Sequence, residues 1–240
     1  MKTIGLLGGM SWESTALYYR LLNEGINHRL GRLHSAKIVL VSVDFEPIEI
    51  LQREGDWEQA GILLAEAGKE IEAGGADFLL ICTNTMHKVA SAVQQAISIP
   101  LLHLADATAE KIRSKNIQTV GLLGTKFTME EDFYKGRLTD KYGLQVIVPE
   151  AKERQSVHRI IFEELCHGRI EKDSKEEYLR IIKKLRADGA EAVIAGCTEI
   201  GMLVNQSHTD VPIFDTTVIH VEKAIEYALT ANIKVFTSLS

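Results

Sequence analysis

A thiol and a hydroxyl occupy matching positions in two copies of one sequence pattern. Thr83 follows the apolar run 75–82, and Cys197 follows the run 189–196, 114 residues further along the chain. A thiolate is a feasible base or nucleophile. A threonine hydroxyl can donate or relay a proton, but its alkoxide is too basic to be populated near neutral pH. The pair therefore predicts acid/base chemistry at a quasi-symmetric site with two unequal arms.

The residues around Cys197 favour a reactive thiol. Cys197 is expected directly after a strand and at the start of a helix, where the pKa of a thiol, ordinarily about 8.5, tends to be lowered. Thr198 and Glu199 add polar side chains at the same strand end. The alternative is an inert buried cysteine, which is the commoner fate of cysteines. The polar neighbours and the repeat favour chemistry.

The matching strand end carries three consecutive polar residues, Thr83, Asn84 and Thr85, which cannot all belong to a core. Asn84 and Thr85 offer hydroxyl, amide and backbone donors suited to a carboxylate, although either can instead be a plain helix N-cap. His87 falls in the first helical turn, where a histidine is more often structural than a catalytic base. Cys82 should point away from Thr83 and into the core.

Glycine-containing turns precede the first helix of each repeat. Met10 and Ser11 follow Gly8-Gly9, and Thr125 follows Gly124. Glycines let a ligand approach the backbone, and the helix N-termini that follow favour an anionic group such as a carboxylate. A dinucleotide loop is disfavoured because the spacing misses G-x-G-x-x-G. A tight turn without a ligand is the remaining alternative.

The repeats predict an α/β fold. Three sequence blocks recur in the same order at offsets of 116, 114 and 112 residues. Short apolar runs alternate with amphipathic stretches, the pattern of mostly parallel sheets flanked by helices. The predicted strands are 3–7, 37–43, 77–82, 100–103, 118–123, 144–148, 191–195 and 212–214. The predicted helices are 12–29 with Ser11 as its N-cap, 57–73, 152–167 and 174–187.

The repeat also predicts two similar domains, 1–105 and 106–216. The second copy is complete without the last helix, 217–230, so we expect this helix to return to the first domain. The tail 231–240 carries no pattern and is expected to fray.

Composition narrows the class of protein. Apolar residues make up 45% and charged residues 25% of the chain, and the net charge is −6 without a basic cluster. This argues against nucleic-acid and membrane partners and favours a small-molecule ligand. Three scattered cysteines form neither a disulfide framework nor a metal motif and fit a reducing cytoplasm. The first residues read as a buried strand rather than a signal peptide.

The polar strand ends resemble the aspartate/glutamate racemase family over nearly the whole chain. Its signatures, Cys-Asn-Thr-x-His and Gly-Cys-Thr-Glu, correspond to residues 83–87 and 196–199, and Gly8-Gly9-Met10 and Phe214–Thr217 are also similar. The resemblance implies two similar domains related by pseudo-two-fold symmetry, with the active site in the cleft between them and no cofactor or metal. The chain looks closest to a bacterial subgroup specific for L-aspartate/glutamate or of broad amino-acid specificity.

Two residues depart from the family pattern. Thr83 replaces the first catalytic cysteine, and Cys166 stands where aspartate racemases place a lysine that binds the distal carboxylate. Gln52 and Arg53, expected in the loop region after the second strand, are candidates for the missing contact. The second departure leaves the side chain of the substrate open.

The resemblance implies an amino-acid racemase that needs no PLP. Cys197 would remove the α-proton and Thr83 would return a proton on the opposite face. Met10, Ser11, Asn84, Thr85, Thr125, Thr198 and Glu199 would bind the substrate. The alternatives are a one-sided cysteine enzyme, such as a malonate-type decarboxylase or a maleate-type isomerase, and a non-catalytic amino-acid-binding relative. A homodimer is possible, because family members are often dimers.

Overall fold

The structure is a computed structural model that describes residues 1–230. The tail 231–240, which we expect to fray, lies outside the described residues. The chain forms two compact units. Of the described residues, the first unit holds Met1–His103 together with residues 220–230, and the second unit holds Leu104–Ile219.

The first unit is built on a three-stranded parallel sheet. Strands β1 (Ile4–Gly8), β2 (Ile38–Ser42) and β3 (Phe78–Ile81) lie in the order β2-β1-β3. The strand predicted at 100–103 is wrong, because only Leu101 pairs, through a single parallel bridge to Leu79. The next helix begins at Leu104, which leaves too little chain for a longer ladder.

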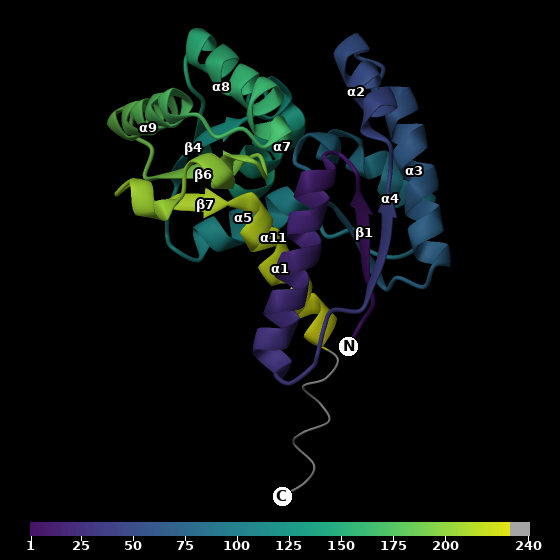
Figure 1. The fold of residues 1–240 in the computed structure, drawn as a ribbon. Coiled ribbons are helices and arrows are strands. Elements are labelled where there is room, and N and C mark those ends of the chain that lie inside the picture. The colour runs from purple at the N-terminus through teal and green to yellow at the C-terminus, as the bar shows by residue number, and fades with distance from the viewer. Residues whose placement is uncertain (231–240) are drawn as a thin grey trace, which may run out of the picture. The chain divides into compact units, whose positions relative to one another are not determined.

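Helices cover both faces of this sheet (Figure 1). Side chains of β1 and β3 alternate between two apolar clusters, because successive residues of a strand point to opposite faces. One cluster joins the sheet to α2 (Phe45–Glu54), α3 (Trp57–Ala73) and α4 (Ala90–Ala96). The other joins it to α1 (Trp12–Leu30) and to α11 (Thr216–Leu229), which begins in the second unit and continues in the first.

The second unit is built on a four-stranded parallel sheet. Strands β4 (Thr119–Gly124), β5 (Gln145–Ile147), β6 (Ala192–Gly196) and β7 (Ile213–Asp215) lie in the order β5-β4-β6-β7. The first three strands of each unit therefore follow the same spatial order, as the repeat in the sequence suggests. The α/β fold with two parallel sheets flanked by helices is confirmed.

The helices of the second unit are mostly short and separate successive strands. They are α5 (Leu104–Arg113), α6 (Lys126–Glu130), α7 (Asp132–Gly136), a π-helical turn η2 (Arg137–Lys141), α8 (Ala151–Glu163), η3 (Leu165–His167), α9 (Lys172–Ala187), α10 (Ile200–Leu203) and η4 (Gln206–His208).

Several helix ends follow from local chemistry. Helices α1, α3 and α9 match the predicted ranges within two residues, and the Ser11 hydroxyl caps α1 by accepting the Ser14 N–H. The helix predicted over 152–167 ends early, at Glu163. The 3₁₀ turn η3 follows it, and Gly168 then closes the segment in a left-handed conformation with φ of 70°.

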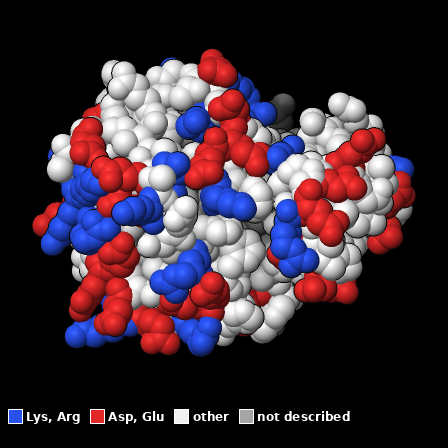
Figure 2. Space-filling model, turned by 90° about the horizontal axis from the view of Figure 1, so that it is seen from above, with Lys and Arg blue, Asp and Glu red and all other residues white. Residues whose placement is uncertain are grey.

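The surface carries charges of both signs. Figure 2 shows Lys and Arg side chains interspersed with Asp and Glu on the face that it presents, without one large basic area. Among residues 1–230, no helix is both long and apolar enough to cross a membrane.

Candidate active site

The predicted site residues, apart from Gln52, follow the carboxyl ends of parallel strands. Six belong to the first unit: Met10, Ser11, Gln52, Thr83, Asn84 and Thr85. Four belong to the second unit: Thr125, Cys197, Thr198 and Glu199. Parallel strands end at a common edge of their sheet, which is where α/β proteins bind ligands. Each unit therefore gathers its own set of candidate residues at one sheet edge.

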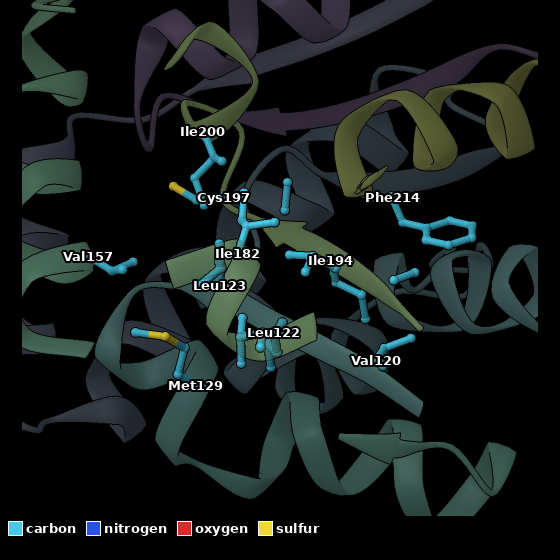
Figure 3. Close-up of a cluster of buried hydrophobic side chains, with 14 of the residues drawn as sticks. Val120, Leu122, Leu123, Met129, Val157, Ile182, Ile194, Cys197, Ile200 and Phe214 are labelled. Atoms are coloured by element: carbon cyan, nitrogen blue, oxygen red, sulfur yellow. The ribbon is translucent and has the colours of Figure 1, made fainter. Parts of the chain in front are cut away.

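In the second unit, Cys197 and Glu199 form a hydrogen-bonded pair directly after β6. The Cys197 thiol donates to Glu199 Oε2 over 2.9 Å. Both side chains are buried, with 9% of Cys197 and 6% of Glu199 exposed, and Cys197 lies beside Ile200 (Figure 3). The Ile200 N–H donates to the Cys197 carbonyl and closes the turn. A carboxylate in contact with a thiol is placed to exchange a proton with it.

The predicted lowering of the Cys197 pKa is wrong. Burial raises the pKa of this thiol well above its ordinary value, and the negative charge of Glu199 raises it further. The helix that follows, α10, has a single turn, so its N-terminus offers little compensating positive potential. Cys197 is therefore a neutral thiol in the free protein. Glu199, rather than a helix dipole, is positioned to take its proton.

Two backbone donors at and just after the second glycine turn are paired within the protein. Thr125 Oγ1 accepts the Thr128 N–H and caps α6, and the Lys126 N–H donates to His158 Nδ1 over 3.3 Å. Burial, with a further contribution from the Lys126 charge, lowers the pKa of His158, so the ring remains a neutral acceptor. The Lys126 N–H is therefore paired within the protein, and anion binding at this helix end stays a prediction.

In the first unit, Thr83 lies two residues beyond β3 and is half-buried, whereas Asn84 and Thr85 are buried. Asn84 precedes the 3₁₀ helix η1 (Thr85–Val89) without a side-chain capping bond, so plain N-capping is not its role. Cys82 is buried in the cluster that contacts α1 and α11, and burial raises its pKa far above the ordinary range. Its assignment to the core is confirmed.

The first glycine turn is packed tightly against its surroundings. Gly9 has φ of 99°, and a Cβ there would lie 2.1 Å from the Val43 carbonyl oxygen. The Gly9 N–H donates to Thr15 Oγ1 over 2.8 Å. Met10 and Ser11 are buried just beyond this turn. Glycines are thus required here because α1 and the chain after β2 pack closely against the turn that follows β1. This holds whether or not the turn also binds a ligand.

Gln52 lies close to the Thr83–His87 segment, but not in a loop as predicted. It belongs to α2, and its side-chain amide donates to Met86 Sδ over 3.0 Å. Gln52 is buried, with 5% of its surface exposed. The neighbouring Arg53 is exposed and pairs with Glu49 on the same helix. The helical spacing of α2 turns Gln52 inward and Arg53 outward, so Gln52 remains a candidate contact and Arg53 does not.

Sequence reasoning missed a polar cluster in the first unit, formed by the buried Tyr18, His87 and His220 and the half-buried His103. The His220 ring stands edge-on to Tyr18 and to His87, and His103 stacks at a tilt against His87 with 4.6 Å between centroids. These four residues come from four separate segments of the chain, so no local spacing links them. Among the described residues, no three His, Cys, Asp or Glu side chains are grouped to hold a metal ion.

Comparison with known families identifies the class of protein. The model of the Asp/Glu/hydantoin racemase family matches residues 7–224, almost the whole chain. The chain belongs to this family and is an isomerase, a racemase.

Three relatives show how far the similarity extends. The crystal structure of an assigned Asp/Glu racemase from Yersinia pestis is 54% identical and has a TM-score of 0.90, covering 95% of this chain and all of its own. An aspartate racemase homologue from Pyrococcus horikoshii is 37% identical with a TM-score of 0.82, covering 95% and 99%. The broad-specificity amino-acid racemase RacX of Bacillus subtilis is 22% identical over 219 residues, 89% of this chain and 92% of that protein.

Proposed function

We propose that the protein racemises an amino acid without a cofactor, with Cys197 as the base and Thr83 as the proton donor on the opposite face of Cα. The observation that supports this most directly is the buried Cys197–Glu199 hydrogen bond at the end of β6. A thiol whose pKa is raised by burial needs a nearby acceptor for its proton, and Glu199, within hydrogen-bond distance of the thiol, is our candidate for that acceptor. Glu199 also stays a candidate substrate contact.

The proton transfers balance as follows. Glu199 accepts the Cys197 proton, and the thiolate removes the α-proton from the substrate and becomes a thiol again. The Thr83 hydroxyl gives its proton to the opposite face of the carbanion while a water molecule replaces that proton on the Thr83 oxygen, so no free alkoxide forms. The hydroxide left by the water is neutralised by the proton that Glu199 releases to solvent. The developing charge on the α-carboxylate requires hydrogen-bond donors, for which Asn84, Thr85 and Thr198 and the backbone near Met10, Ser11 and Thr125 are the candidates.

The substrate ammonium group assists the first transfer. The negative charge of Glu199 and the burial of Cys197 both oppose formation of a thiolate. A bound amino acid brings a positive charge close to Cα, which favours the thiolate when substrate is present. The thiol therefore ionises in the complex rather than in the free protein, which protects it from unproductive reactions.

The substrate class is aspartate, glutamate or a wider set of amino acids. The names of the relatives cover both possibilities, since two refer to aspartate or glutamate and one to broad specificity. Cys166, in place of the family lysine, offers no positive charge for a distal carboxylate, and burial raises its pKa to about 12, so it is a neutral thiol. Gln52 is the candidate for a weaker, neutral contact, which favours the wider range. Three free cysteines are consistent with a cytoplasmic setting.

The test is a panel of L-amino acids incubated with the protein in deuterium oxide and followed by loss of the α-proton signal in NMR. We expect loss of the signal for at least one acidic or small amino acid, and no loss with Cys197→Ala. Cys82→Ala is the matched control, because Cys82 is a buried thiol in an apolar cluster of the first unit and has no proposed role in the reaction. Binding of amino acids without exchange would instead indicate a non-catalytic relative, and activity only on malonates or maleate-like diacids a one-sided enzyme.

A further inference from the structure

Two consecutive carbonyl groups at the end of β3 are held by side chains. Ser14 Oγ, from α1, donates to the Cys82 carbonyl over 2.6 Å, and His87 Nδ1 contacts the Thr83 carbonyl over 2.7 Å. His87 is 2% exposed and Thr83 is half-buried, so this second bond is partly shielded from water. A bond to a peptide carbonyl fixes the backbone at that residue, and the Thr83 hydroxyl is carried by that backbone.

The contact also fixes the protonation of the His87 ring. A carbonyl oxygen only accepts hydrogen bonds, so His87 Nδ1 carries a proton. The same argument applies to His220, whose Nε2 donates to the Leu102 carbonyl over 2.8 Å and whose Nδ1 accepts from the Tyr18 hydroxyl over 2.9 Å. Burial, together with the nearby His87, lowers the pKa of His220 to about 3, so this ring is neutral.

His220 and His103 hold the His87 ring in place. The His87 and His220 centroids lie 5.9 Å apart and the His87 and His103 centroids 4.6 Å apart. Because both nitrogens of the His220 ring are engaged, that ring cannot rotate freely, and it forms a fixed wall against which His87 packs. His87 thus reaches the Thr83 carbonyl with little loss of side-chain freedom.

We propose that His87 is a positioning residue for Thr83: its Nδ1–H holds the Thr83 backbone so that the hydroxyl faces Cα of the substrate. This assignment rests on the proposed function, in which Thr83 supplies the second proton. It differs from a role for His87 as the base, because the ring contacts the Thr83 peptide and not its hydroxyl.

In the second unit, the Cys197 carbonyl accepts the backbone N–H of Ile200. A side-chain contact to the preceding strand comes from Thr216 Oγ1, which donates to the Ala195 carbonyl over 3.0 Å. Loss of His87 should therefore weaken only the arm of the reaction that uses Thr83. A general loss of structure would weaken both arms.

The experiment compares two nearly isosteric variants, His87→Asn and His87→Leu. An asparagine amide places an N–H near the position of His Nδ1, whereas leucine has the same shape without the donor. The readout is the amount of D-enantiomer formed per deuterium incorporated into the L-substrate. Incorporation with retention needs only Cys197, and inversion needs Thr83 as well. Thr216→Val is the control that removes a side-chain bond to a strand carbonyl in the other unit.

We expect His87→Leu to lower this ratio by about tenfold, a loss consistent with a misplaced donor, and His87→Asn to keep it within about threefold of the wild-type value. Thr216→Val should leave the ratio unchanged. Equal ratios in wild type and His87→Leu would overturn the positioning role of His87 and leave the proposed function standing. Absence of any exchange in the wild-type protein would overturn the proposed function as well.

A second measurement does not depend on variants that fold. In wild-type protein labelled with ¹⁵N-histidine, NMR distinguishes a protonated Nδ1 from a protonated Nε2. We expect a slowly exchanging proton on Nδ1 of His87. A His87 ring that carries its only proton on Nε2 would contradict the contact on which the assignment depends.

Discussion

The ends of β3 and β6 are equivalent by sequence and by strand order, yet they prepare different chemistry. After β6, a carboxylate contacts a thiol directly, from Glu199 to Cys197. After β3, a histidine contacts the peptide carbonyl of Thr83. A thiol needs help to lose a proton, and a hydroxyl that only donates needs to be placed correctly. In the mechanism that we propose, the contact after β6 serves proton transfer and the contact after β3 serves the placement of a hydroxyl.

The interiors of the two units also differ in how their apolar and polar residues are packed. The second unit packs its buried apolar residues into one cluster around the sheet, which reaches as far as Cys197 (Figure 3). The first unit separates its apolar residues into two clusters, one on each face of the sheet, and adds the buried polar group of Tyr18, His87 and His220. Buried polar groups of this kind favour one arrangement over others when they are fully hydrogen-bonded.

The largest expected effect is at the β6 end. Cys197→Ala should lower α-proton exchange by about 10³-fold or more, because it removes the only proposed base. Cys82→Ala, at the β3 end but in the core, should leave exchange within about threefold. NMR of the L-substrate in deuterium oxide measures both. Substantial exchange in Cys197→Ala would show that another group is the base.

The next effect concerns Glu199. In Glu199→Gln we expect exchange to fall by about 10²-fold, because the thiol loses its proton acceptor. The Cys197 pKa should fall at the same time, since the carboxylate charge is one of the causes that raise it. Alkylation of Cys197 by iodoacetamide, followed by mass spectrometry, should therefore be faster while turnover is slower. Parallel loss of both rates would mean that Glu199 only supports the local structure.

A third effect tests the buried histidine cluster of the first unit. The His220 pKa is lowered to about 3 by burial, so between about pH 6.5 and 3 the unfolded chain binds a proton that the native protein does not. As the pH is lowered from 7 to 5, the free energy of unfolding should therefore decrease, by about 2 kcal/mol from this residue. His220→Gln should be less stable at pH 7 but should lose that part of the pH dependence. Urea titrations at both pH values measure it, and an unchanged slope would contradict a neutral His220.

The smallest effect is a gain. Thr83→Cys gives both strand ends a thiol, and we expect formation of the D-enantiomer to rise by up to about tenfold. The reason is that a thiol exchanges protons near neutral pH far more readily than a hydroxyl. Thr83→Ser is the control and should stay near the wild-type rate. Chiral chromatography of the products gives both values. A loss of D-product in Thr83→Cys would mean that the site requires the smaller oxygen.

Much of the fold could be predicted because the two units pack in similar ways and therefore keep the same residue types at equivalent positions. Gly5 and Gly121 hold equivalent positions in β1 and β4, and a Cβ there would lie 2.5 Å from Ile71 in α3 and 2.9 Å from Leu185 in α9. Such constraints preserve recognisable residues in both copies. The positions of Thr83 and Cys197 after their strands follow from the same repeat.

The environment of the site residues could not be predicted in the same way. The raised pKa of Cys197 depends on burial and on Glu199, and burial is a property of the packed chain. Gln52 turns inward only because its segment is helical, and apolar residues in a short stretch do not distinguish a helix from a loop. The histidine cluster joins residues distant in sequence, from Tyr18 to His220. These features arise from tertiary contacts and have no local pattern.

The most direct test of the unequal strand ends is solvent deuterium exchange into each enantiomer of the best substrate, measured separately as initial rates at saturating concentration. We predict fast loss of the α-proton from the L-enantiomer, on which the proposed base Cys197 would act, and a rate at least about tenfold slower for the D-enantiomer, on which Thr83 would act. Equal rates for the two enantiomers would contradict the division of labour between a thiol base and a hydroxyl donor.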